Sequence, residues 1–178
     1  MKILVADDES MIRLGLKSML RELGHVAILA KNGQDALKKA FAENPDLAIL
    51  DIQMPKTNGL QLAKALNKHR PMPIIFLSAY SQDDVVEQAT NLNVHGYLIK
   101  PTSSAELKVA ISVAIKRFRE LKRVEKRLDA RTLIDRAKAL LMAQGLSEQA
   151  AFTKIQTAAR NSNRGMDAVA RELLDNGG

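Results

Sequence analysis

The sequence contains no cysteine and no tryptophan, and only 3% of its 178 residues are aromatic. Without cysteine the chain has no disulfide, no thiolate nucleophile and no sulfur ligand for a metal. With so few rings, the core has to be built from aliphatic side chains, which the apolar fraction of 46% supplies. The composition therefore excludes disulfide scaffolds and thiol enzymes and indicates a globular protein with an aliphatic core.

Long apolar runs are also missing, and none approaches the roughly eighteen residues of a membrane span. Asp7 and Asp8 follow the amino terminus too closely for a signal peptide. We therefore expect a cytoplasmic protein that does not enter a membrane.

The formal net charge is +7, and the excess is denser towards the carboxyl end. Residues 1–117 carry 15 basic and 12 acidic side chains, whereas residues 118–178 carry 12 and 8. A basic tail is compatible with nucleic acid, although a solvated helical face is the commoner cause of a mild excess.

One stretch, Leu47–Pro55, organises the rest of the chain. Four apolar residues run without a break into Asp51, and a turn follows within four positions. Such a run is typical of a strand buried on both faces, as in a parallel sheet covered by helices. A carboxylate at its carboxyl end then lies where open α/β sheets place their ligands.

Strand and helix patterns alternate through the first part of the chain. This alternation predicts an α/β fold with a doubly wound five-stranded parallel sheet and right-handed crossovers. The expected strands are 2–6, 26–30, 47–51, 74–77 and 96–99, and the expected helices are 10–23, 33–43, 59–66, 81–91 and one that begins at about 104.

Polar residues follow the apolar part of four of these strands and gather at one edge of the predicted sheet: Asp7, Asp8, Asp51, Ser78 and Lys100. The three acids form an oxygen-only site, which suits Mg²⁺ better than zinc. The metal would screen the charge between Asp51 and an incoming phosphoryl group, so that the carboxylate can attack phosphorus. Lys100 would supply a cation and Ser78 a hydroxyl for the phosphoryl oxygens.

The helix from Ser104 continues beyond the expected sheet. Leu107, Ile111, Ala114, Phe118 and Leu121 follow 4-3-4-3 spacing, and Leu128 extends this apolar seam past Glu125. The spacing predicts a helical linker over residues 104–130 that forms a homodimer as a coiled coil. The alternative is a solvated connector helix.

The apolar pattern of residues 131–178 predicts a small bundle of three short helices. Leu133, Ile134, Ala137, Leu140 and Leu141 form one apolar helical face. Gly145 ends that helix and Ser147 caps the next, which carries Ala151, Phe152, Ile155 and Ala159. Met166, Val169, Ala170, Leu173 and Leu174 form the third apolar face. We expect Phe152 in the core of this bundle.

Four motifs in order resemble the receiver domain of bacterial two-component response regulators. They are Val5-Ala-Asp-Asp8, Leu50-Asp-Ile-Gln-Met-Pro55, Leu77-Ser-Ala79 and Tyr97-Leu-Ile-Lys-Pro101. The resemblance covers residues 1–120 and implies a flavodoxin-like receiver fold. It also implies that a sensor histidine kinase phosphorylates Asp51.

The resemblance further implies the roles of individual residues. Mg²⁺ would be bound by Asp8, Asp51 and the backbone carbonyl of Gln53, with Asp7 assisting. Ser78 and Tyr97 would form the switch pair, and the Lys100–Pro101 peptide bond would be cis. Thr102 departs from the family, in which an aromatic residue commonly follows the Lys-Pro pair.

The tail is similar to the ANTAR domain, an RNA-binding antitermination module. The similarity covers residues 129–176 and lies in Arg131-x-x-Ile134-Asp-Arg-Ala-Lys138-x-Leu-Leu-Met142, Gly145-Leu-Ser-Glu148 and Ala151-Phe152. Ala139 and Arg160 depart from the usual Gly and Met of that family. The resemblance implies binding of RNA hairpins, and we expect Arg136, Lys138, Arg160 and Arg164 to contact them.

Three other functions compete with this hypothesis. The tail could form a helix-turn-helix of a DNA-binding response regulator, or a bundle that only dimerises. An aspartyl-phosphate enzyme needs a second carboxylate two residues after its nucleophile, and Gln53 occupies that position. We therefore expect a regulator and not an enzyme.

Overall fold

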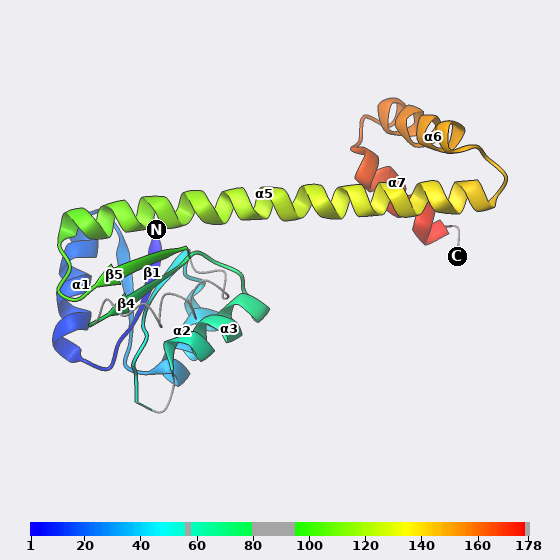
Figure 1. Cartoon of the computed structure of the whole chain (residues 1–178). Helices are drawn as coiled ribbons and strands as arrows, with labels where there is room; N and C mark the ends of the chain where they lie inside the picture. The colour runs from blue at the N-terminus through cyan, green and yellow to red at the C-terminus, as the bar shows by residue number, and fades with distance from the viewer. Residues whose placement is uncertain (56–57, 80–94, 177–178) are drawn as a thin grey trace. The chain divides into compact units, whose positions relative to one another are not determined.

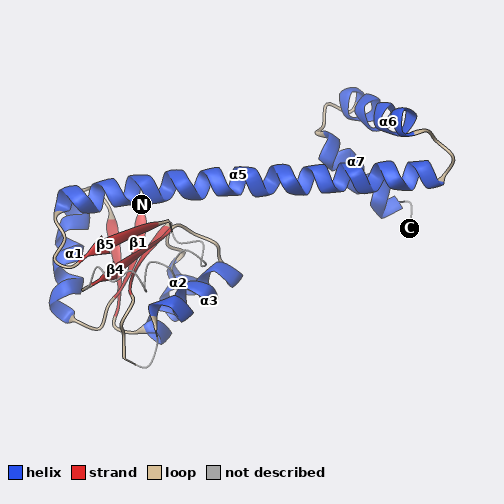
Figure 2. Cartoon of the chain, in the orientation of Figure 1, coloured by secondary structure: helices blue, strands red, loops and turns tan. Residues whose placement is uncertain are grey.

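A computed structural model describes residues 1–55, 58–79 and 95–176 (Figure 1). The chain divides into two compact units, Met1–Arg119 and Glu120–Gly178. The first unit holds a sheet covered by helices, and the second is helical (Figure 2).

The sheet of the first unit has five parallel strands, as the sequence predicted, and their order is β2-β1-β3-β4-β5. Its central strand β3 is buried along its whole length, which explains its unbroken apolar run. The strands are β1 (Lys2–Ala6), β2 (Val26–Ala30), β3 (Leu47–Asp51), β4 (Ile74–Ser78) and β5 (Gly96–Ile99).

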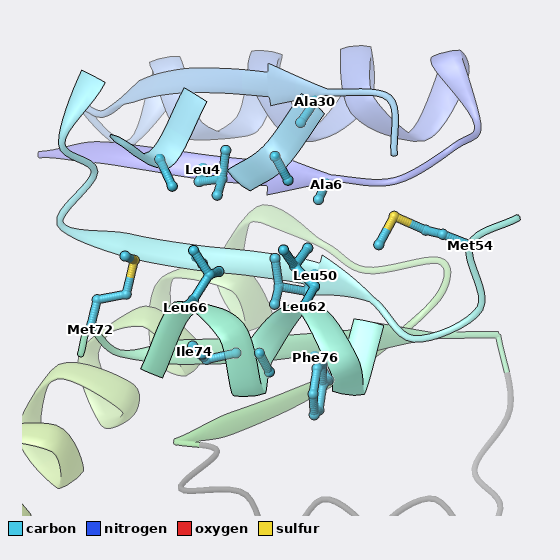
Figure 3. Close-up of a cluster of buried hydrophobic side chains, with 14 of the residues drawn as sticks. Leu4, Ala6, Ala30, Leu50, Met54, Leu62, Leu66, Met72, Ile74 and Phe76 are labelled. Carbon is cyan, nitrogen blue, oxygen red and sulfur yellow. The ribbon is translucent and has the colours of Figure 1, made fainter. Parts of the chain in front are cut away.

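Helices cover both faces of the sheet, so the doubly wound fold is confirmed. On one face α2 (Gly33–Glu43) and α3 (Gly59–His69) enclose a core that includes Leu4, Leu50 and Phe76 (Figure 3). On the other face α1 (Ser10–Glu22) and the first turns of α5 (Ser104–Ala143) pack on Ile3, Ile49 and Leu77 among others.

Local signals explain where these helices begin and end. The side chains of Asn32 and Asn58 accept hydrogen bonds from Asp35 N and Leu60 N and cap α2 and α3. Gly24 has a φ of +78° after the end of α1, as a C′ glycine requires. The helix predicted at 81–91 lies outside the described residues.

The start of α5 is fixed by a capping box of Ser103 and Glu106. Glu106 Oε2 accepts hydrogen bonds from Ser103 N and Ser103 Oγ at 2.8 Å each. Ser103 Oγ in turn accepts one from Glu106 N at 3.3 Å. Thr102 Oγ1 also contacts Glu106 Oε2, at 3.4 Å, so this departure from the receiver motif contributes to the cap.

The linker helix and the first helix of the tail are one continuous helix of 40 residues, α5. The sequence separated them at Arg131, but no glycine or proline lies between Ser104 and Ala143 to interrupt the backbone. The predicted apolar seam therefore divides along one helix. Leu107, Ile111 and Ala114 are buried against the sheet of their own unit, whereas Leu121 and Leu128 are exposed.

The second unit is a bundle of the carboxyl-terminal turns of α5 with α6 (Glu148–Asn161) and α7 (Met166–Asn176). Gly145, with a φ of +97°, ends α5, and Ser147 caps α6 by accepting from Ala150 N. The core contains Ala137, Leu141, Ala151, Ile155, Ala159, Val169 and Ala170.

Phe152 does not lie in this core, contrary to the prediction, and 38% of it is exposed. The buried residues of α6 recur every four positions, at Ala151, Ile155 and Ala159. Phe152 is one position further on, about 100° around the helix, and so leaves the core face. The bundle therefore presents an aromatic ring at its surface.

No helix among the described residues combines the length and the hydropathy needed to cross a membrane.

Candidate functional site

The candidate site lies at the carboxyl edge of the parallel sheet, where β1, β3, β4 and β5 end. Asp51 is the last residue of β3, and Asp7 follows β1 directly. Asp7 and Asp51 are both buried, whereas Asp8 is exposed. The sheet topology thus gathers the three predicted acids at one edge, with Asp8 towards solvent.

Lys100, which follows β5, lies among these carboxylates. Its Nζ lies 3.0 Å from Asp51 Oδ2 and donates a hydrogen bond to it. The same Nζ lies 2.7 Å from the buried Oδ2 of Asp7, as an ion pair without the angle of a hydrogen bond. It also contacts Glu9 Oε1 at 3.3 Å. The peptide bond from Lys100 to Pro101 is cis, as the family resemblance implied.

Burial and charge act in opposite directions at this site. Burial raises the pKa of Asp51 and outweighs the opposing influence of Lys100, while the charge of Asp7 raises it further. For Lys100, burial alone would lower the pKa, but the contacts with Asp7 and Asp51 outweigh it and raise the pKa. Lys100 therefore stays charged over the whole physiological pH range.

The arrangement of the acids fits a divalent cation. One carboxylate oxygen from each of Asp7, Asp8 and Asp51 lies within 4.8 Å of the others. An octahedral Mg²⁺ with ligands at about 2.1 Å separates opposite oxygens by about 4.2 Å, so small side-chain rotations would bring these oxygens into range. The donors are all oxygens, which hard cations prefer.

The remaining predicted site residues border this edge. Gln53 N donates a hydrogen bond to Asp51 Oδ1 at 3.2 Å, and the Gln53 side chain is exposed. Ser78 ends β4 and is buried. Tyr97 lies on β5 beside Phe76 and packs, half-buried, against the core under α2 and α3.

Two residues that support the site were missed in the sequence. Arg13 Nη1 donates to the backbone oxygens of Asp7 and Asp8, at 2.7 and 2.9 Å, and so fixes the turn that carries both acids. Gly59 N donates to Ile52 O, and a Cβ on Gly59 would lie 2.1 Å from Asp51 O. Both contacts form only when the turns after β1 and β3 have folded, so no sequence motif predicts them.

The basic residues predicted to contact RNA lie in the second unit and differ in their surroundings. Arg136 on α5 and Arg160 in the last turn of α6 are exposed. Lys138 is held between Glu148 Oε1 at 3.0 Å and Asp135 Oδ1 at 3.3 Å, and these acids raise its pKa. Arg164 forms an ion pair with Glu172 on α7 at 2.6 Å.

Comparison with known families decides the identity of both units. The chain matches the response regulator receiver domain over residues 3–112 and the ANTAR domain over residues 122–174. The chain belongs to the response regulators that carry both domains. It is thus a two-component regulator with an RNA-binding output, and both matches are to regulatory modules, not to an enzyme family.

Individual relatives extend the likeness over the whole chain. The Transcriptional regulatory protein PdtaR of Mycobacterium tuberculosis is 39% identical over 98% of this chain and 89% of its own length. The crystal structure of response regulator TrrA from Thermotoga maritima, in complex with Mg²⁺-BeF, matches the receiver domain. It has a TM-score of 0.58 and 39% identity, covering 64% of this chain and 97% of that one.

A second solved structure gives the same fold. A response regulator receiver domain protein from Clostridium thermocellum has a TM-score of 0.62 and 32% identity, over 67% of this chain and 98% of that one. The edge that carries Asp7, Asp8 and Asp51 is therefore the acidic pocket of a receiver domain, where members of this family generally bind Mg²⁺.

Proposed function

We propose that Asp51 accepts a phosphoryl group from a sensor histidine kinase and that this modification controls RNA binding by the ANTAR domain. The position of Lys100 carries the proposal. Its ammonium group lies 3.0 Å from Asp51 Oδ2, in a pocket that exposes a further carboxylate, Asp8, to solvent. A nucleophile, a cation and metal ligands are the parts that phosphoryl transfer needs.

In this mechanism a carboxylate oxygen of Asp51 forms a bond to phosphorus while the bond from phosphorus to a kinase histidine nitrogen breaks. Asp7, Asp8, Asp51 and the Gln53 carbonyl would hold Mg²⁺, which neutralises charge on the phosphoryl oxygens when bound. Lys100 then exchanges part of its contact with Asp51 for a phosphoryl oxygen. Because its pKa is raised, it remains a cation throughout.

Ser78 and Tyr97 are proposed to transmit the modification. Ser78 ends the strand next to β3 and carries a hydroxyl suited to a phosphoryl oxygen. Tyr97 lies on the adjacent strand β5 and is half-buried, and its ring is proposed to change position as Ser78 moves. Ser78 and Tyr97 would therefore connect Asp51 on β3, through β4, to the outermost strand β5.

The output is proposed to be transcription antitermination through RNA hairpins, since the mycobacterial relative is named a transcriptional regulatory protein and the ANTAR match spans the tail. A homodimer through α5 would present two ANTAR domains. It is supported by Leu121, Val124 and Leu128, whose exposed fractions are 45%, 51% and 61% on one side of the helix.

One experiment tests both halves of the proposal. Wild-type protein and Asp51→Asn are incubated with a small phosphodonor and Mg²⁺, their intact masses are measured, and their affinity for hairpin RNA is then compared. The wild type should gain one phosphoryl group and bind RNA more tightly, whereas Asp51→Asn should do neither. A phosphorylated Asp51→Asn would refute the acceptor, and equal affinities of modified and unmodified wild type would refute the coupling.

Asp8→Ala extends this test to the metal. The variant removes an exposed carboxylate ligand and leaves the contacts of Lys100 in place. Its phosphorylation should lose its dependence on Mg²⁺. An unchanged Mg²⁺ titration would show that Asp8 does not bind the metal.

A further inference from the structure

Most of the net charge of this protein lies in the middle of α5. The stretch Lys116–Arg131 carries eight basic and three acidic side chains, a net of +5 out of +7 for the whole chain. Every residue from Arg119 to Asp129 is exposed. This part of the helix is therefore a strongly basic surface outside the core of either domain.

The charges are sorted around the helix. Lys116, Arg119, Arg123 and Lys126 follow one another at intervals of three, four and three residues, so they share one face, and Arg127 adjoins it. We name these five residues the basic stripe. None of them forms an ion pair with an acid in the part of the chain that the structure describes. The nearby Glu125 pairs with Lys122, which borders the stripe and is not one of the five. The stripe is thus free to contact an anionic partner.

The apolar residues lie on the opposite side. Leu121, Val124 and Leu128 lie about 100° to 160° around the helix from Arg123 and Lys126, at about 100° per residue. A dimer formed through these apolar residues would leave Arg119, Arg123 and Lys126 on the outside of each copy, with Arg127, three residues after Val124, at the border of the interface. Self-association and an anionic partner therefore do not compete for the same face.

Within the second unit, the face of the basic stripe continues into the ANTAR domain. From Lys126, steps of four, four, three and four residues lead through Ala130 to Ile134, Ala137 and Leu141. The last two are buried under α6 and α7, and Ile134 packs against the same core. By this spacing, α6 and α7 cover the side of α5 on which the stripe lies nearer the amino-terminal end of the helix.

We propose that the basic stripe is a second contact surface for the RNA that the ANTAR domain binds, and that it grips the phosphate backbone of the hairpin stem. This inference rests on the proposed RNA-binding output. The stripe extends over about 17 Å, at 1.5 Å per residue, enough to follow several phosphates. No aromatic residue occurs between Phe118 and Phe152, so the stripe offers cations for phosphates and no aromatic ring on which a base could stack.

The test compares two doubly neutralised proteins of equal charge. Arg123→Gln/Lys126→Gln removes two members of the stripe, and the control Lys64→Gln/Lys68→Gln removes two exposed charges on α3 of the receiver domain. Each full-length, phosphorylated protein is titrated with a hairpin RNA and with the same hairpin whose stem is halved, at several salt concentrations. Sedimentation checks that both variants keep the oligomeric state of the wild type.

The stripe variant should bind the long hairpin about tenfold more weakly than the control, and the slope of log affinity against log salt should fall by about two. On the halved stem the two variants should bind alike. Equal affinities for the long hairpin would overturn the inference while leaving the RNA-binding output intact. Failure of the wild type to bind either hairpin would overturn the output itself.

Two further measurements complete the test. If the stripe variant changes the oligomeric state, Arg119→Gln/Arg127→Gln, also within the stripe, replaces it against the same control. Because a basic helix with an apolar side also suits a membrane surface, binding to anionic phospholipid vesicles is measured in parallel. Loss of vesicle binding with unchanged RNA binding would assign the stripe to lipid and overturn the proposal.

Discussion

At the scale of single residues, Gly59 shows how closely the backbone is packed around Asp51. A Cβ at this position would meet Asp51 O at 2.1 Å and Ile52 Cα at 3.0 Å, and both are backbone atoms that cannot rotate aside. Glycine is needed here for close approach and not for its φ angle, and it sets the distance between α3 and the end of β3. The position of the acceptor thus depends on a residue without a side chain.

Gly59→Ala should lower the free energy of unfolding by about 1–3 kcal/mol, because it forces the loop after β3 to move. It should also slow phosphorylation of Asp51. Gly15→Ala is the matched control, since nothing lies within 4 Å of its Cβ position in α1. That change should raise stability by about 0.4–1 kcal/mol. Urea denaturation measures both, and equal shifts would contradict the close approach.

His95 is a buried titratable residue outside the acceptor site. Its Nδ1 accepts a hydrogen bond from Ile74 N at 3.3 Å, and its ring meets Phe118 edge-on at 5.2 Å between centroids. Burial lowers the pKa of His95, and the neighbouring Arg117 lowers it further. The folded protein therefore holds a neutral imidazole that the unfolded chain protonates more readily.

The pH dependence of stability follows from this difference. Because the folded pKa lies below the unfolded value of about 6.5, stability should be full above that pH and decrease as the pH falls towards the folded pKa. His95→Leu should remove this part of the slope, at a cost of about 1–3 kcal/mol for the unpaired Ile74 N–H. His69→Leu, on an exposed site, is the control. A slope that survives in His95→Leu would exclude His95 as its source.

At the scale of helices and strands, the alternation of patterns predicted every described strand to within a residue. It did so because buried parallel strands leave unbroken apolar runs in the sequence. The merging of the linker and the first tail helix was not predicted, since the apolar face changes at Arg131 while the backbone does not. Phe152 was misplaced for a related reason: apolar character alone does not fix the angle of a residue around a helix.

The same limit applies to the acceptor site. Its acids and Lys100 could be predicted, because the parallel direction of the strands brings their carboxyl ends to one edge. Arg13 and Gly59 contact backbone atoms of the site. Every residue has the same backbone atoms, so the sequence contains no particular residue type that would reveal such a contact. The sequence therefore predicts the reacting groups, but it does not predict residues such as Arg13 and Gly59 that hold these groups in place.

The apolar side of α5 yields a prediction about self-association. Leu121→Asp/Leu128→Asp would place charges in the proposed interface, where unpaired charge is costly to bury. The variant should sediment as a smaller species than the wild type. Ser112→Asp/Ala130→Asp adds the same charge on the opposite side of the helix and should leave the oligomer intact. If both variants behave like the wild type, the middle of α5 is a solvated connector.

At the scale of the whole molecule, we expect RNA recognition to combine the exposed charge of Arg160 with the exposed ring of Phe152. Arg160→Ala should weaken hairpin binding and reduce the salt dependence of that binding, because Arg160 is exposed and can contact a phosphate.

Phe152→Ala should weaken hairpin binding by about 1–3 kcal/mol if a loop base stacks on the ring, and should leave the salt dependence unchanged. Lys138→Ala is a less clean test, since Lys138 also joins α5 to Glu148 on α6. Tighter binding to duplex DNA than to the hairpin would favour a DNA-binding regulator.

Because α5 is one continuous helix, adding residues to it rotates the part beyond the insertion about the helix axis and also moves that part along the axis. One alanine inserted after Leu128 turns everything beyond it by about 100° about the helix axis, whereas seven inserted residues add nearly two whole turns. A single insertion would therefore move the basic stripe out of line with Ala137 and Leu141, and a seven-residue insertion would restore the alignment about 10 Å further along. We expect RNA affinity to fall with the first insertion and to recover with the second, so that this helix tolerates changes of length only in steps that conserve its phase.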